Sequence, residues 1–210
     1  MSLGEPCGTA PRVAVDVSDL PTYSFANRSL MWWGTLGFIA IETSGFGLAI
    51  ATYLYFAQKG QSWPPDSPPP DLLPGTVLTV LLLLSLIPNQ LTKRWAQAED
   101  ASKTRLGLVI LCIAGVLPII VRVFEFRALN VRWDTDAYGS IVWLLLGLHT
   151  THLVTDVVDT IVLTALMFTR HGYQGRRFSD VYDNASYWDF VVVSCLPVYF
   201  ILYWFPRLVS

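Results

Sequence analysis

Four titratable side chains recur at helical spacing in one apolar stretch: His149, His152, Asp156 and Asp159. Steps of three, four and three residues place all four on one stripe of a helix. Three interpretations are open: a structural seam satisfied by Arg122 and Glu42 on adjacent helices, a path for protons or ions, or a set of zinc or iron ligands. A His-x-x-His pair alone is a weak metal signal. We therefore favour the seam and expect no metal site.

Four further polar residues lie in or beside apolar stretches: Glu42, Arg122, Glu125 and Asp189. Because lipid disfavours an ionised carboxylate, we expect Glu42 to be protonated or paired; it is either a neutral acid bonded to a neighbouring helix or a proton-handling group.

Arg122 precedes Glu125 by three residues, which predicts an ion pair within one helix. We also expect Arg122 to lie nearest Asp156 or Asp159, since these acids would otherwise be unpaired buried charges. Asp189 follows Ser186 by three residues at the start of an apolar stretch, so it is expected to cap that helix.

The elements that position these residues are five apolar stretches, each close to the roughly 20 residues that cross a bilayer. The composition, 53% hydrophobic and 14% charged, differs from that of an ordinary soluble domain, and no basic face for nucleic acid is present. The sequence predicts an all-α, polytopic bundle of five transmembrane helices. The expected spans are 33–56, 73–91, 106–126, 141–168 and 187–205.

The distribution of Lys and Arg predicts the topology. Nine of them fall on the side of the N-terminus and four on the other, so the positive-inside rule places the N-terminus in the cytoplasm or in a mitochondrial matrix. Residues 1–30 are expected to form a cytoplasmic segment with no signal peptide, and residues 31–207 the membrane domain. The proline-rich loop 63–74 is expected to be non-helical. Glycines are expected to let another helix approach the first span closely, at Gly34, Gly37, Gly45 and Gly47.

Short motifs follow one another in a fixed order from residue 32 to residue 206. They are Trp33-Gly34 with Ile41-Glu42, Leu73-Pro74-Gly75-Thr76, Glu125-Phe126, Tyr138-Gly139-Ser140, Gly147-Leu148-His149-Thr150-Thr151-His152 and Tyr187-Trp188-Asp189-Phe190-Val191. In this order the motifs resemble those of subunit III of the haem–copper respiratory oxidases, in the short five-helix form found in many bacteria.

The resemblance implies a non-redox auxiliary subunit in a bacterial inner membrane. Such a subunit packs on catalytic subunit I, beside subunit II, and leaves haem and copper to those partners. It holds phospholipid in a cleft between its helices and supports proton delivery during aerobic electron transport. No catalytic residue is implied in this chain; Glu42, Glu125, His149 and His152 would be inherited positions of a polar network.

The chain departs from the family pattern at four positions. Asp189 stands for a histidine, Val192 for an aspartate, Asp156 for a glycine and Arg122 for a glutamine. Two alternatives therefore stay open: an accessory subunit of a nitric oxide reductase, and an independent metal-dependent enzyme or proton-coupled transporter that uses the stripe from His149 to Asp159.

Overall fold

The computed structural model describes residues 23–60, 62–65, 67–173 and 175–209, and within them it contains helices and no strand. All five predicted spans are present, and each helix is long and apolar enough to cross a membrane. The prediction of an all-α bundle of five spans is confirmed. Most of the predicted N-terminal segment lies outside the described residues. The elements are η1 (Ala26–Arg28), α1 (Leu30–Lys59), α2 (Leu72–Gln97), α3 (Ala101–Arg127), α4 (Ala137–Met167), η2 (Arg170–Tyr173), α5 (Gly175–Tyr199), the π-helical turn η3 (Phe200–Trp204) and α6 (Phe205–Val209).

Two predicted boundaries are wrong. The fifth helix begins at Gly175, twelve residues before the expected start, because its polar first turns bury Phe178 and Val181 against the bundle. The loop prediction fails at Pro74, since α2 begins at Leu72. Proline is tolerated there because the first amide groups of a helix have no partner within the helix.

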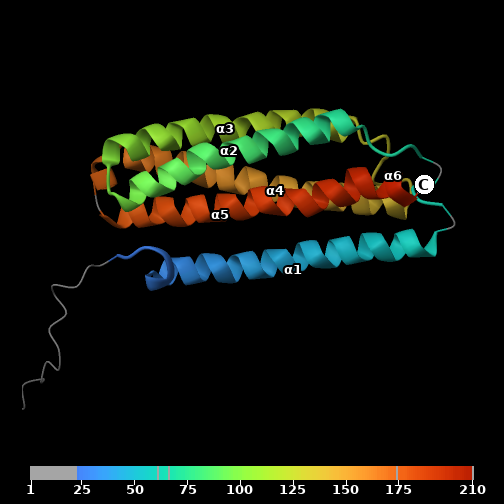
Figure 1. Cartoon of the computed structure of the whole chain (residues 1–210), viewed down its shortest axis with the longest axis horizontal. Coiled ribbons are helices and arrows are strands. Elements are labelled where there is room, and N and C mark those ends of the chain that lie inside the picture. The colour runs from blue at the N-terminus through green and yellow to red at the C-terminus, as the bar shows by residue number, and fades with distance from the viewer. Residues whose placement is uncertain (1–22, 61, 66, 174, 210) are drawn as a thin grey trace, which may run out of the picture.

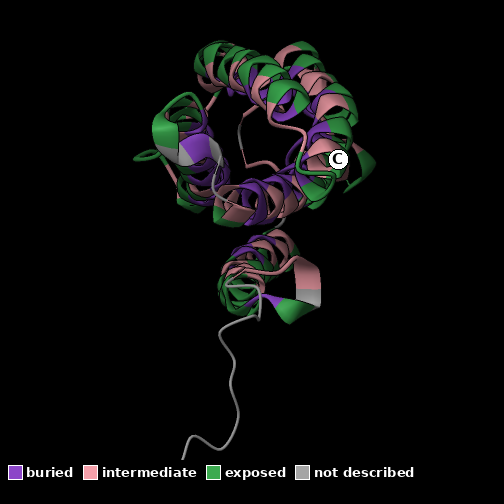
Figure 2. Ribbon diagram, turned by 90° about the vertical axis from the view of Figure 1, so that its left-hand side faces the viewer, coloured by how far each residue is buried: buried purple, intermediate pink, exposed green. Residues whose placement is uncertain are grey.

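Four helices form the body of the bundle and the first helix lies outside it. Seen end-on, α2, α3, α4 and α5 form a ring that carries most of the buried residues, whereas α1 lies to one side (Figure 2). Its main helix contacts are with α4 and α5. Only 11% of the apolar window of α1 is buried, against 50% for α4. Its buried residues, Phe46, Ala49 and Tyr53, all belong to its C-terminal half, so α1 docks mainly by that half.

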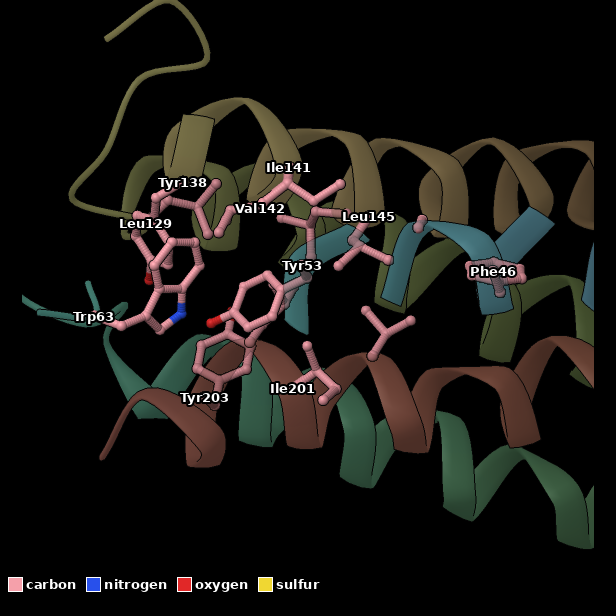
Figure 3. Packing of buried hydrophobic residues seen from close by; sticks show 14 residues of the cluster. Phe46, Tyr53, Trp63, Leu129, Tyr138, Ile141, Val142, Leu145, Ile201 and Tyr203 are labelled. Carbon is pink, nitrogen blue, oxygen red and sulfur yellow. The ribbon is translucent and has the colours of Figure 1, made fainter. Parts of the chain in front are cut away.

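The docked end of α1 is held by an aromatic cluster at the C-terminal end of the bundle. The rings of Tyr53, Trp63 and Tyr138 meet with centroids 4.9 to 6.2 Å apart. Figure 3 shows these rings beside Tyr203 and Ile201 of the last turns. The start of α1 and the C-terminus lie at opposite ends of the bundle (Figure 1).

Close helix approach depends on glycines in α2 and α3 instead of those in α1. A Cβ at Gly75 would lie 2.4 Å from Cζ of Tyr203, and one at Gly107 would lie 2.2 Å from Oγ1 of Thr92. Within this chain no helix approaches the first helix at its glycines, since nothing lies within 4 Å of a Cβ built at Gly34, Gly37, Gly45 or Gly47.

Candidate functional site

The eight candidate side chains are not gathered at one centre; they are divided among four contact groups. The His149–Asp159 stripe itself divides: His149 faces α3 and α5, His152 faces α1, and Asp156 faces α5. Within the described residues no group of three His, Cys, Asp or Glu side chains could hold a metal ion.

The first group, the Glu42 cluster, consists of Glu42, His152 and Tyr187. Nε2 of His152 lies 2.8 Å from Oε1 of Glu42, and the Tyr187 hydroxyl donates to the Glu42 carboxyl at 2.8 and 3.0 Å. Nδ1 of His152 lies 2.6 Å from the Leu148 carbonyl, which can only accept, so Nδ1 carries a proton. The contact between Glu42 and His152 therefore holds one proton, either on the acid or on the imidazole.

The second group, the aspartate cluster, consists of Asp156, Asp159 and Asn184. Nδ2 of Asn184 donates to Asp156 at 2.8 Å and more weakly to Asp159 at 3.5 Å. Thr160 donates to the Asn184 carbonyl at 3.1 Å, which fixes the amide orientation. Oδ2 of Asp156 is buried and has no hydrogen-bond partner among the described residues. The Asn184 amide is therefore the polar neighbour that the two acids share, and within the described residues neither acid forms an ion pair with Lys or Arg.

The third group, the arginine cluster, lies between α3, α4 and the last turns of the chain. Arg122 pairs with Glu125 at 2.7 Å, which confirms the predicted ion pair, and both side chains are 3% exposed. Its second nitrogen donates to Nδ1 of His149 at 2.6 Å. Nε2 of His149 must then carry the proton that it shares with the Val191 carbonyl at 3.0 Å. The Tyr203 hydroxyl donates to Glu125 at 2.6 Å.

The expectation that Arg122 lies nearest Asp156 or Asp159 is wrong. Arg122 lies near the C-terminal end of α3, and in the antiparallel helix α4 that level holds His149, about two turns from Asp156.

The fourth group joins Asp189 to α2. Lys93 pairs with Asp189 at 2.9 Å, and Asn89 and Gln90 donate to the same carboxylate at 2.8 Å. The predicted helix-capping role of Asp189 is wrong, because α5 begins fourteen residues earlier at Gly175. Asp189 instead fixes the register of α5 against α2.

A cavity of about 770 Å³ lies where α1 stands away from α4 and α5. We call it the α1–α4–α5 cavity. Its walls include Phe38 and Glu42 of α1, His152, Asp156 and Asp159 of α4, and Arg176, Arg177, Asp180, Asp183 and Tyr187 of α5. It begins at the end of the bundle where α5 starts and reaches the Glu42 cluster. The Glu42 and aspartate clusters, which share no direct hydrogen bond, are thus joined by one space.

Sequence reasoning missed Asn184, Tyr203, Tyr187 and Asp183 as members of these groups. Asn184 and Asp183 precede the apolar stretch that predicted the fifth span. The steps from Arg176 to Asp180, Asp183 and Tyr187 are four, three and four residues, a helical stripe that an amphipathic reading of 175–187 would have found. Tyr203 had no sequence signal, because the π-helical turn sets the direction of its side chain.

Comparison with known proteins gives one consistent result. The family model described as cytochrome c oxidase subunit III matches residues 32–207. The chain is 26% identical over 190 residues to a "Probable cytochrome c oxidase subunit 3" of Mycobacterium tuberculosis, an alignment that covers 86% of this chain and 91% of the relative. The corresponding protein of Mycobacterium leprae matches with the same identity and coverage. The "Cytochrome c oxidase subunit 3" of Synechocystis sp. is 24% identical over 182 residues, 83% of this chain and 75% of the relative.

Proposed function

The chain belongs to the cytochrome c oxidase subunit III family and is an auxiliary, multi-pass membrane subunit of a haem–copper oxidase, and from this premise we propose how it contributes to the complex. It packs on catalytic subunit I, beside subunit II, carries no haem or copper of its own and supports proton uptake by the catalytic subunit during turnover. The observation that carries this proposal is the acid-lined α1–α4–α5 cavity, which ends at the Glu42 cluster.

The orientation belongs to the same proposal. The start of α1, the end of α4 and the start of α5 lie at one end of the bundle, and the short loops at that end are rich in Lys and Arg. The positive-inside rule then directs the mouth of the cavity toward the cytoplasm of a bacterial cell, across its inner membrane. Reporter fusions after Ser67 and after Arg176 test this: we expect the first outside and the second inside. The same side for both fusions contradicts the topology.

Phospholipid binding is also part of the proposal. The cavity has largely apolar walls, and Arg176 and Arg177 at its open end offer guanidinium groups to a phosphate. Replacing both arginines with glutamine should reduce the phospholipid that co-purifies with the chain. Arg132→Gln, on the loop at the opposite end, is the matched control because it removes an exposed guanidinium away from the cavity.

The decisive experiment is purification through an affinity tag on this chain in mild detergent, followed by haem, copper and subunit analysis. We expect a larger haem- and copper-containing partner, and we expect both cofactors to be lost when that partner is stripped off. An oxidase prepared without this chain should take up oxygen at first and then lose activity during turnover. Stoichiometric zinc or iron on the isolated chain would instead support an independent enzyme.

A further inference from the structure

Carboxyl groups line the α1–α4–α5 cavity at successive depths. With a rise of 1.5 Å per residue, Asp180 lies about 8 Å and Asp183 about 12 Å from the start of α5. On α4, Asp159 lies about 12 Å and Asp156 about 17 Å from the helix end at the same side. Glu42 lies about 18 Å from the start of α1. The acids thus run from the open end of the cavity to the Glu42 cluster.

Two of these acids are almost fully buried and have carboxyl oxygens without a hydrogen-bond partner among the described residues. Asp183 is 4% exposed and neither of its oxygens has a partner among the described residues; Asp156 is 2% exposed and its Oδ2 also lacks one. Both side chains line the cavity. A buried carboxyl oxygen needs either water or a proton of its own. The cavity, at about 770 Å³, is large enough for bridging water, which occupies about 30 Å³ per molecule in the liquid.

The charges around the cavity favour proton exchange more than a fixed ion pair. Each wall contributes: Glu42 from α1, His152 with Asp156 and Asp159 from α4, and Arg176, Arg177, Asp180 and Asp183 from α5. Arg177 already pairs with Asp180 at 2.9 Å. Lys93 of α2 acts on Asp183 through its charge but forms its ion pair with Asp189. Among the described residues no Lys or Arg forms an ion pair with Asp183, Asp159 or Asp156, so a proton is the charge that can neutralise them.

The cavity ends at the Glu42 cluster. The Phe46 ring lies over His152 with centroids 5.1 Å apart, and Phe46 belongs to the apolar cluster that continues toward the other end of the bundle. A proton that reaches Glu42 must therefore leave by the way it came, or into a partner subunit.

We propose that the α1–α4–α5 cavity is a one-ended proton inlet, in which Asp180, Asp183, Asp159 and Asp156 exchange protons between the surface and Glu42. A hydronium ion protonates an outer carboxylate, which passes its proton inward through water and regains the next one. At the end, the contact between Glu42 and His152 gives up its one proton, which leaves a carboxylate beside a neutral imidazole and lowers the net charge of the pair by one; the next proton from the inlet restores it. The inlet rests on the proposed function for its purpose, a proton supply beside the catalytic subunit, but not for its chemistry.

Hydrogen–deuterium exchange at Glu42, followed by infrared spectroscopy, tests the inlet on the full chain in lipid nanodiscs. The carbonyl band that disappears in Glu42→Gln identifies the protonated acid, and its downshift after mixing with D₂O reports exchange. We expect rapid exchange in the wild type. In the double variant Asp156→Asn, Asp159→Asn, exchange should slow about 100-fold, the scale of a lost positioned acid–base group.

Two variants that add bulk without changing any charge test whether protons pass through the cavity itself. Gly34 lines the cavity and Gly47 does not, and a Cβ at either position meets open space. Gly34→Leu should therefore slow exchange, whereas Gly47→Leu should leave it at the wild-type rate. Unchanged exchange in both the aspartate variant and Gly34→Leu overturns the inlet, as does a wild type whose Glu42 shows no protonated band. Neither result depends on a partner subunit, so a failed co-purification refutes the proposed function and leaves this test standing.

Discussion

Replacing Arg122 with leucine should destabilise the bundle strongly, because it leaves Glu125 as a buried carboxylate without its cation. The pair is 2.7 Å apart and both side chains are 3% exposed. Breaking such a pair by removing one partner costs about 3–5 kcal/mol. For a chain of this size about 1 kcal/mol shifts the midpoint of thermal unfolding by roughly 2–4 °C, so we expect a fall of about 6–20 °C.

A double-mutant cycle isolates the interaction. Arg122→Leu and Glu125→Leu should each lower the free energy of unfolding. The double variant should lose less than the sum of the two single losses, since no lone charge remains. Unfolding is followed by tryptophan fluorescence in detergent. The control cycle pairs Arg122→Leu with Asp156→Leu. These two side chains share no contact, so their losses of unfolding free energy should add. A coupling between Arg122 and Glu125 below about 0.5 kcal/mol would refute the electrostatic account.

Three further predictions concern a proton, a helix cap and a close contact. Glu42→Gln should leave the fold intact at a cost of about 1 kcal/mol, because an amide can accept from tyrosine and donate to the unprotonated imidazole nitrogen; yield of folded chain measures it. The Lys103 side chain and amide hold the pKa of Asp100 below its usual range, so stability from this cap is present above the unfolded pKa of about 4 and is lost as pH falls through the folded value. Thermal unfolding at stepwise lower pH checks this. Gly75→Ala should cost about 1–3 kcal/mol, because the new methyl group would overlap the ring of Tyr203; chemical unfolding measures it.

Each of these predictions has a matched control. Glu42→Lys should prevent folding, since it places a fixed charge in the bilayer; equal damage from Gln and Lys would mean that Glu42 is ionised and paired. Asp100→Asn keeps a capping oxygen but cannot titrate, so the acid-dependent loss should disappear. Gly45→Ala meets open space and should stabilise α1 slightly, the opposite sign to Gly75→Ala.

Local sequence patterns were sufficient to predict the membrane spans and one ion pair. The length and hydropathy of a segment are enough to identify a transmembrane helix. Residues three apart on a helix lie close together whatever surrounds the helix, as Arg122 and Glu125 do. The partners of Asp156 and Asp189 depend on how neighbouring helices are shifted along one another. That shift follows from side-chain packing across the whole bundle, which no local pattern contains. The contacts expected for Asp156 and Asp189 were therefore both wrong.

The sequence also did not predict which face of a helix packs against the rest of the chain. The glycines of α1 suggested a packed surface, but the periodicity of small residues does not say whether the neighbour belongs to the same chain. The polar start of α5 was missed because a hydropathy window stops where the charges begin, although the helix and its Asp183 continue outward.

The peripheral position of α1 imposes an order on biosynthesis. α1 is made before the other four long helices, yet its main helix contacts are with α4 and α5, the last two of them. Tyr187, which bonds to Glu42, follows it by 145 residues. At 5–20 residues per second, α1 spends roughly 7 to 29 s on the ribosome before that partner is made. During that interval the nascent Glu42 side chain lacks the Tyr187 hydroxyl, and until α4 is made it also lacks His152, so contacts outside the chain would have to satisfy it.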